Sequence, residues 1–433
     1  MNRSSLAAGV LALALPALAD SVHAEEGMWP PAIVPVAQQE RSMGARFDKA
    51  LFERLQLATV KFGGATGFFV SPSGLMMTNH HVGLRCVQSV STTDNNYYVN
   101  GYIAGDRAGE LRCPSQEAWV LMSYSDITEE VGKALSGPPA NRTPAEVQAE
   151  IENRCNRESS LVCEVVSLSG GARRFLYRYR KYDDVRLVTA PEIQVAYFGG
   201  DPDNFEYPRY YIDVALFRIY QGGSPVTPPA YLDLAQRGAA EGDSVIVSGH
   251  PRRTNRSLTV SQLEVLRDVT MPLWVRSHER RIKLLEAYRK GSAEKVRRSA
   301  NFIFFARNSF KRDNGFLTAL RSPQTLAAQG SKFSELAQAL KDDEARGNLA
   351  RLLESAAQLA AKDRKFVVED YYVSPYTGSR LFEWAVLLTR WAEQTAMPEG
   401  ARLEDFRGSR LKGTESWITS VTPPTGLNHA SVA

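Results

Sequence analysis

The sequence predicts a mixed β + α protein, in which a β-rich first part is followed by a long helical segment. Residues 68–77 hold two short apolar runs around a Pro/Gly turn, which is typical of a β-hairpin. Residues 184–198 are rich in Val and Tyr, which favour strands. From residue 257 to about residue 394, apolar side chains recur every three or four positions, as in amphipathic helices.

The composition is that of an ordinary globular protein. The chain has 433 residues, of which 43% are hydrophobic and 23% charged, and this length favours about two to three domains. A net charge of +4 is too small to predict binding to nucleic acid. Basic residues crowd together in residues 276–312, but Glu279, Glu286 and Glu294 interrupt them, which favours a solvated helix face.

The first 24 residues have the pattern of a signal peptide. Arg3 supplies the positive start, residues 6–18 the apolar core, and Val22-His23-Ala24 a cleavage site of small residues. The apolar core is too short to span a bilayer, and no later apolar stretch is long enough. We therefore expect an exported protein, periplasmic or secreted, with no membrane span.

Export would allow disulfides, and the chain has four cysteines, Cys86, Cys113, Cys155 and Cys163. Four cysteines allow three pairings. A short loop would join Cys155 to Cys163, which would leave Cys86 for Cys113. The sequence contains no C-x-x-C or H-E-x-x-H motif and only six histidines, so we expect neither a zinc site nor a cofactor.

Several elements follow from local patterns in the first half. Residues 39–59 read as an amphipathic helix, and residues 97–102 and 118–122 as strands. A second helix is expected from residue 143 to about residue 156. Thr143 would be its N-cap, Pro144 its first residue, and Glu146 would complete a capping box.

The predicted hairpin ends in Thr78-Asn79-His80-His81. A histidine held on a rigid hairpin is well placed to serve as a general base. A structural or metal-binding pair is the alternative, although adjacent side chains on extended backbone point to opposite faces and seldom chelate one ion. The residues alone leave catalysis and a structural role open.

A second polar residue stands out at the start of another predicted strand. Residues 214–217 form an apolar run, and Asp213 precedes it. A carboxylate at the mouth of a buried strand needs a partner, and a histidine that donates its second ring N–H would provide one. Taken alone, Asp213 is better interpreted as a structural residue that caps a turn.

The hairpin that leads into T-N-H-H resembles the first barrel of chymotrypsin-type serine peptidases. The chain more closely resembles the bacterial secreted dipeptidyl aminopeptidases, which include dipeptidyl-peptidases seven and eleven. The similarity runs from Glu26-Gly27-Met28-Trp29 to about Arg410. It implies a chymotrypsin-like double β-barrel with a large α-helical cap domain. Many relatives have Cys where this chain has Ala65 and Val82, so a disulfide that clamps the hairpin is missing.

The resemblance also implies roles for particular residues. His81 would be the general base and Asp213 the carboxylate that orients it. Asn204 and Asn308 would hold the free amino group of an oligopeptide substrate, with Asn301 as the alternative to Asn308. Phe205 would be an aromatic wall where relatives usually have Trp. His250 lies in the turn Ser248–Pro251, which would close the first barrel, and is expected to be structural.

The resemblance implies a domain layout with an unusual end. Residues 1–24 would be the signal peptide, 25–256 the first barrel with its N-terminal helix, 257–410 the helical cap, and 411–433 a disordered tail. No serine after Asp213 lies in a G-x-S-G context. Ser169 lies in a Gly-rich segment, but it precedes Asp213 and so breaks the chymotrypsin order of His, Asp and Ser.

We therefore expect a chain truncated before its second barrel. The first hypothesis is a serine dipeptidyl-peptidase that removes dipeptides from peptide N-termini, with this chain inactive by itself. The alternative is a catalytically inactive protein that binds peptides. Neither hypothesis involves nucleic acid, and both allow a homodimer.

Overall fold

The computed structural model describes residues 28–44, 47–92, 94–114, 116–138, 142–251, 256–373, 380–407, 411, 414 and 415. The predicted signal peptide and almost all of the predicted tail lie outside these residues. The chain divides into two compact units, Met1–Phe52 with Ala239–Ile246, and Glu53–Gly238 with Val247–Ala433. The sheet and the long helices belong to the second unit, so the boundary expected after residue 256 stays a prediction.

The prediction of a single helix over residues 39–59 is wrong, because two helices occupy this region. After the 3-10 turn η1 (Pro31–Ile33), α1 spans Val36–Met43 and α2 spans Lys49–Ala58. Gly44 ends α1 with a φ of 61°, in the left-handed region that glycine adopts most easily. Thr59 already belongs to the first strand.

Eleven strands of the described residues form one antiparallel sheet. Their bounds are β1 Thr59–Phe62, β2 Ala65–Phe69, β3 Leu75–Thr78, β4 Tyr102–Ile103, β5 Leu111–Arg112, β6 Ala118–Asp126, β7 Val162–Leu168, β8 Arg173–Tyr182, β9 Asp184–Ala190, β10 Ala215–Gln221 and β11 Ser224–Pro225. The order along the main path is β4-β9-β10-β3-β2-β1-β6-β8-β7, while β11 pairs with β10 and β5 with β9.

The predicted hairpin is confirmed as β2–β3. Phe68 lies opposite Met77 and Phe69 opposite Met76. The Ser71 hydroxyl accepts the backbone N–H groups of Ser73 and Leu75, which stabilises the turn. Gly74 has a φ of 69°, and a Cβ there would lie 2.8 Å from the Ile219 carbonyl oxygen, so the turn requires glycine.

One hydrophobic core lies inside this part of the sheet. The largest of its fully buried side chains are Val60, Phe62, Phe69, Met76, Leu84, Val87, Leu187, Phe217 and Ile219. They come from β1, β2, β3, β9, β10 and the helix α3 (His80–Val90). Because the core joins β3, α3 and β10, it fixes the positions where these elements meet.

A second core lies under two helices that pack against β7 and β8. The helices are α5 (Thr128–Ser136) and α6 (Pro144–Glu158). The buried side chains of this core are Ile127, Val131, Val147, Ile151, Cys155, Cys163, Val165 and Leu176. The predicted start of α6 is confirmed, since Thr143 and Glu146 form the capping box and Pro144 is the first residue.

Two strand predictions are corrected. Residues 97–102 are mostly the short helix α4 (Tyr97–Asn100), because the Asn96 side chain caps it by accepting the Val99 N–H. Only Tyr102 belongs to a strand, β4. The strand expected over 184–198 ends at Ala190, before Pro191, and α7 (Ile193–Ala196) follows. The strand expected over 118–122 is confirmed as part of β6.

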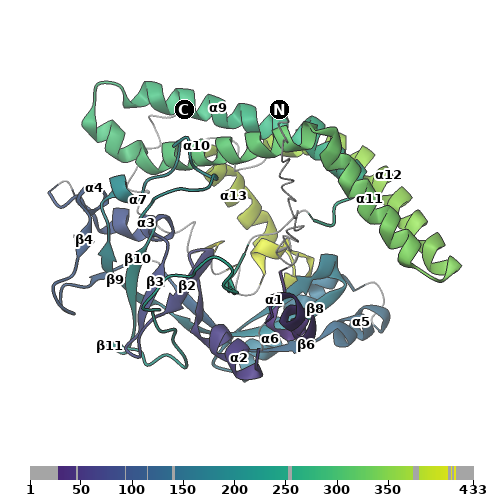
Figure 1. Cartoon of the computed structure of the whole chain (residues 1–433), viewed down its shortest axis with the longest axis horizontal. Coiled ribbons are helices and arrows are strands. Elements are labelled where there is room, and N and C mark those ends of the chain that lie inside the picture. Colours follow the sequence, from purple (N-terminus) through teal and green to yellow (C-terminus); the bar gives the residue numbers. More distant parts are fainter. Residues whose placement is uncertain are drawn as a thin grey trace, which may run out of the picture. The chain divides into compact units, whose positions relative to one another are not determined.

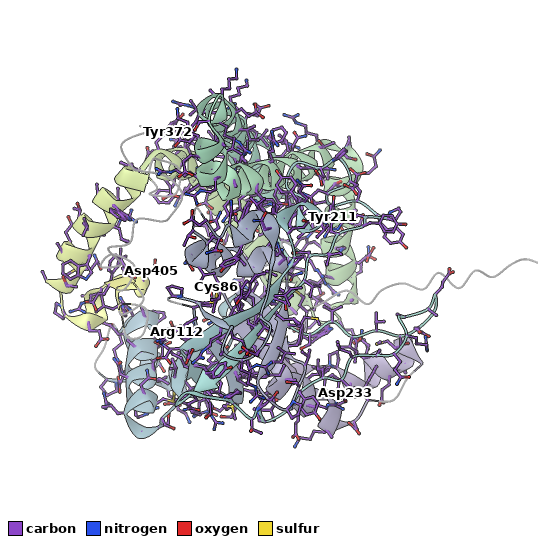
Figure 2. The ribbon with its side chains drawn as sticks, turned by 90° about the vertical axis from the view of Figure 1, so that its left-hand side faces the viewer. Cys86, Arg112, Tyr211, Asp233, Tyr372 and Asp405 are labelled. Atoms are coloured by element: carbon purple, nitrogen blue, oxygen red, sulfur yellow. A yellow bond between two sulfur atoms is a disulfide. The ribbon has the colours of Figure 1, made fainter. Side chains whose placement is uncertain are left out.

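Two disulfides join all four cysteines. They pair Cys86 with Cys113 and Cys155 with Cys163, which is the pairing that a short loop favours. Cys86 lies among the packed side chains of the first core (Figure 2). Ser169 lies in the 3-10 turn η2 (Ser169–Gly171) between β7 and β8, so that its segment is a turn between strands.

The helical pattern predicted after residue 257 is confirmed. The elements are α8 Val260–Val265, the π-helical turn η3 Leu266–Thr270, α9 Met271–Arg289, α10 Ala293–Arg321, α11 Pro323–Ala339, α12 Asp343–Val373 and α13 Arg380–Thr395, before the short turns η4 Glu399–Ala401 and η5 Glu404–Phe406. The long helices α9 and α10 run side by side (Figure 1). Across the described part of the chain, no helix combines the length and the apolar character that a bilayer span requires.

Candidate active site

The candidate site begins where β3 ends and α3 starts. Thr78 is the last residue of β3, Asn79 is the N-cap, and His80 and His81 form the first turn of α3. The sequence had suggested that the two histidines lie on extended backbone. This is wrong, because both belong to a helix. Successive residues of a helix point about 100° apart. As a result His80 is fully buried, whereas the His81 side chain is 33% exposed.

His81 is held by Asp213 through two contacts. Its ring Nδ1 lies 2.8 Å from the Asp213 Oδ2 atom, and its backbone N–H donates to Oδ1 over 2.9 Å. Asp213 precedes β10, and β10 pairs with β3 so that Ala215 lies opposite Thr78. This register brings Asp213, two residues before β10, to the start of α3.

Asn79 supports the same carboxylate. Its side-chain amide lies 3.2 Å from the Asp213 Oδ2 atom and 3.3 Å from the Asp213 carbonyl oxygen. An N-cap side chain usually accepts a backbone N–H of its own helix, but that of Asn79 makes no such bond. The sequence interpretation missed this role, although Asn79 lies within the motif that indicated the site.

The surroundings of Asp213 keep it ionised. Burial alone would raise the pKa of Asp213, but the hydrogen bonds and the charge of His81 outweigh it, so that the pKa is lowered. A carboxylate that accepts from Nδ1 leaves Nε2 as the ring nitrogen able to take up a proton. The His81–Asp213 pair can thus act as an oriented general base.

His80 has a different environment. Within the described residues, neither ring nitrogen of His80 has a hydrogen-bond partner in good geometry. Burial lowers the pKa of His80, against the opposing charge of Asp213, which favours a neutral ring. This buried neutral ring suits a structural role rather than proton transfer.

Aromatic side chains connect His81 to the helical part of the same unit. The His81 ring meets the edge of Phe198 at 5.3 Å between centroids, and Phe198 meets Phe304 of α10 at 4.7 Å. A Cβ at Gly199 would lie 2.6 Å from the Phe304 carbonyl oxygen, so only glycine allows this approach. In the sequence, Phe198 is marked only by its place before Gly199 and Gly200.

Two asparagines meet beside this aromatic contact. The Nδ2 group of Asn204, which is fully buried, donates to the Asn308 Oδ1 atom over 2.9 Å. Arg209 donates to the Asn204 Oδ1 atom over 3.1 Å, a contact that the sequence did not predict. Asn301 instead donates to Gln88 over 2.6 Å, so Asn308 is the candidate that the fold brings to Asn204.

The turn that carries Asn204 is tied to α10. Lys311 of α10 donates to the Glu206 carboxylate over 2.8 Å and also to the Pro202 carbonyl oxygen. Phe205 has a φ of 65° and a side chain that is 54% exposed. Its ring therefore stands at the surface next to the buried Asn204.

His250 lies apart from this site. Its backbone N–H donates to the Thr66 hydroxyl over 2.7 Å, and Ser248 lies 3.2 Å from the Thr59 hydroxyl. Burial, and secondarily the charge of Lys61, lowers the pKa of His250 to about 4. These contacts fit the structural role expected for it.

The arrangement combines an oriented histidine ring with a pair of hydrogen-bonded amide groups. Among the described residues no serine hydroxyl contacts the His81 ring, and no group of three or more His, Cys, Asp or Glu side chains is suited to a metal ion. The described residues thus bring a histidine and a carboxylate together at this place in the fold.

Comparison with known proteins identifies relatives over most of the chain. A family model described as Peptidase S46 matches residues 24–427. An Asp/Glu-specific dipeptidyl-peptidase of Shewanella putrefaciens is 29% identical over 423 residues, which cover 91% of this chain and 57% of that protein. Dipeptidyl-peptidase 7 of Porphyromonas endodontalis is 34% identical over 212 residues, which cover 46% of this chain and 26% of that protein.

The fold is similar to that of solved relatives. A crystal structure of Porphyromonas endodontalis DPP11 in complex with substrate matches with a TM-score of 0.69 at 20% identity, over 91% of this chain and 60% of that one. A second structure of DPP11, in complex with the dipeptide Arg-Glu, matches with a TM-score of 0.64 over 76% of this chain. The chain thus spans little more than half the length of these relatives.

Proposed function

The chain belongs to the Peptidase S46 family, and on this basis we propose that it forms the base-carrying half of an exported, serine-type dipeptidyl-peptidase. In this proposal the sheet is the first barrel of a chymotrypsin-like double barrel, and the helices from α8 onward are its cap. The substrate is an oligopeptide with a free N-terminus. The product is a dipeptide.

His81 and Asp213 would perform the proton transfers. The Nε2 atom of His81 takes the proton of an attacking serine hydroxyl and later gives it to the departing amine. Asp213 holds the ring in the correct tautomer and stabilises the imidazolium that forms. The serine would come from residues outside these 433, because none after Asp213 lies in a G-x-S-G context.

One observation carries the proposal. The fold connects an oriented base, His81, to a pair of amide side chains, Asn204 and Asn308, that could hold the substrate. Phe198 contacts both His81 and α10, and α10 supplies Asn308 to Asn204. Amide oxygens can accept from an ammonium group without adding a charge. A peptide held there by its N-terminus would present a fixed bond to the base, which is what dipeptide release requires.

A chimaera tests this function. The chain would be joined to the part of the Shewanella putrefaciens relative that it does not match, and release of a fluorophore from dipeptidyl substrates would be measured. We expect activity that His81→Ala abolishes, and no cleavage of the N-acetylated substrate. A folded chimaera whose activity persists in His81→Ala would contradict the proposed base.

The second candidate function is peptide binding without catalysis. The absence of a serine in a nucleophile context favours it, since Asn204 and Asn308 need no serine to bind an amine. Calorimetry with a free peptide and its N-acetylated form would then show binding of the free form alone, weakened in Asn308→Ala. Binding by the chain together with an inactive chimaera would favour this candidate.

A further inference from the structure

A cavity lies in the second core, away from the candidate active site. Its volume is about 390 Å³, and its lining includes Ser125, Ile127, Ile151, Leu176 and Arg178. In the sheet, β2, β1 and β6 separate β8, which carries Arg178, from β3. The volume falls within the roughly 300–1,000 Å³ that is usual for small-molecule sites.

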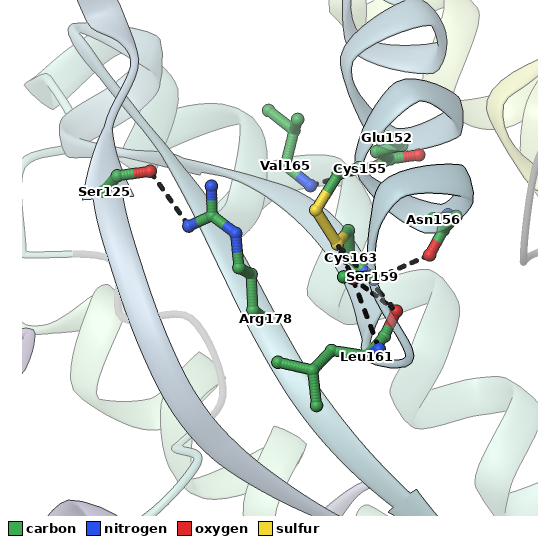
Figure 3. The surroundings of a disulfide bond; sticks show 9 residues. All are labelled: Ser125, Glu152, Cys155, Asn156, Ser159, Leu161, Cys163, Val165 and Arg178. Carbon is green, nitrogen blue, oxygen red and sulfur yellow. Dashed lines mark hydrogen bonds between the residues drawn. A yellow bond between two sulfur atoms is a disulfide. The ribbon is translucent and has the colours of Figure 1, made fainter.

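The walls of this cavity are rigid. The disulfide Cys155–Cys163 joins the end of α6 to the start of β7. The Asn156 side chain accepts the Cys163 N–H over 3.0 Å, and Glu152 accepts the Val165 N–H over 2.7 Å (Figure 3). A pocket held in this way is largely formed before a ligand arrives, which lowers the cost of binding.

Arg178 is the unusual member of the lining. It lies between Ser123 of β6 and Cys163 of β7 in the strand register, and its side chain points between Ser125 and the disulfide (Figure 3). Arg178 is half-buried as a residue, and its guanidinium donates to the Ser125 hydroxyl over 3.2 Å. Within the described part of the chain, no carboxylate lies within ion-pair distance of it.

The other charges of the cavity are paired or exposed. Arg154 donates to Glu130 in an ion pair, and Glu158 lies on the exposed rim. A guanidinium has five N–H donors, and that of Arg178 donates to one neutral partner, so that other donors can bind a ligand. The adjoining wall is apolar, formed by Ile127, Ile151 and Leu176.

We propose that this cavity is a second ligand site, which binds a small carboxylate with an apolar body. The carboxylate would accept two parallel hydrogen bonds from Arg178, the geometry that a guanidinium fork favours. The apolar body would lie against Ile127, Ile151 and Leu176. This site does not depend on the proposed peptidase function.

Three probes with one carbon skeleton test the site. Leucine and 4-methylpentanoate both carry the carboxylate, whereas 4-methylpentanamide is the neutral control. We expect saturable binding of at least one acid to the purified chain by equilibrium dialysis and saturation-transfer NMR, and none of the amide. Tighter binding of leucine would identify free amino acids as the source, and tighter binding of 4-methylpentanoate would identify short fatty acids.

Substitutions of Arg178 test whether this residue binds the carboxylate of the ligand. Arg178→Gln should weaken the affinity by at least about tenfold, because a hydrogen bond to a charged group is lost. Arg180→Gln is the matched control, since Arg180 is exposed on the same strand and outside the cavity lining. Arg178→Lys keeps the charge but not the fork and should bind at an intermediate level, with thermal melting confirming that each variant folds.

Absence of binding by both acids to the folded chain would overturn the proposal. Equal binding of the amide would also overturn it, as would an affinity that Arg178→Gln leaves unchanged.

Discussion

His81 and Asp213 are joined twice although 132 residues separate them in sequence, through the ring Nδ1 to Oδ2 at 2.8 Å and the backbone N–H to Oδ1 at 2.9 Å. The second bond means that Asp213 fixes the first turn of α3 as well as the imidazole. A change at Asp213 should therefore affect folding stability in addition to any proton transfer.

Asp213→Asn should lower the free energy of unfolding by about 1.5–3 kcal/mol at pH 7, since hydrogen bonds to a charged acceptor are lost. The pKa of Asp213 is lowered in the folded state, so its contribution is present above an unfolded pKa near 3.9 and is lost as the pH falls through the folded value. Urea unfolding at pH 7 and at about pH 3 should thus show a smaller difference between wild type and variant at the lower pH.

Asp94→Asn provides the control for that experiment, because Asp94 is exposed. It should unfold like the wild type at both pH values. An Asp213→Asn variant as stable as the wild type at pH 7 would show that the two bonds contribute nothing to folding.

The chain of 433 residues by itself should not hydrolyse dipeptidyl fluorogenic substrates, because no serine after Asp213 has a nucleophile context. Without a nucleophile, a triad enzyme retains at most a small residual rate. The assay should compare the purified chain with its His81→Ala variant. Turnover that this substitution abolishes would refute the prediction.

Gly199→Ala should destabilise the protein by about 1–3 kcal/mol, because its Cβ would lie 2.6 Å from a backbone oxygen of α10 that cannot move alone. Gly315→Ala is the matched control, since Gly315 lies in α10 with no atom within 4 Å of the added Cβ. That variant should gain up to about 1 kcal/mol from helix propensity. Equal denaturation midpoints of the two variants would contradict the close approach.

His250 should make the protein sensitive to acid. Its pKa is about 4 in the folded state against a usual 6.5, so the unfolded state binds more protons between these values. The free energy of unfolding should therefore fall as the pH drops from about 6.5 to about 4, by at most roughly 1.4 kcal/mol per pH unit. His250→Gln should flatten this slope in urea titrations.

Thr66→Val is the control for that slope. It removes the hydroxyl that accepts the His250 N–H but keeps the ring that titrates. It should lower stability at every pH without changing the slope between pH 4 and 6.5. A flattened slope in Thr66→Val would assign the effect to local unfolding rather than to the ring.

Self-association is the last expectation. Large apolar side chains are exposed in the segment before Asp213, with Tyr207 98% and Tyr210 89% exposed. Such a patch favours association. Light scattering should show oligomers that the double substitution Tyr207→Ser and Tyr210→Ser reduces, while Tyr372→Ser, at another exposed tyrosine, leaves them unchanged. A monodisperse wild-type monomer would contradict this and favour the peptide-binding hypothesis.

The sequence by itself determined the local elements whose causes are local. The β2–β3 hairpin followed from its Pro/Gly turn, α6 from Thr143 and Glu146, and the late helices from apolar periodicity. The resemblance to a known family also pointed to His81 and Asp213, whose chemistry stays a prediction. Two of the local predictions were wrong, each because of a single residue. Gly44 ends a helix inside the region where one continuous helix was expected, and Asn96 caps a helix where a strand was expected.

Only the tertiary structure decided which distant side chains meet. The pairing of β10 with β3 brings Asp213 to His81, and the packing of Phe304 on Gly199 brings Asn308 rather than Asn301 to Asn204. Arg209, Asn79 and the cavity around Arg178 became visible in the same way. The physical reason is that hydrogen bonds and close packing depend on distances in space, which local sequence patterns do not contain.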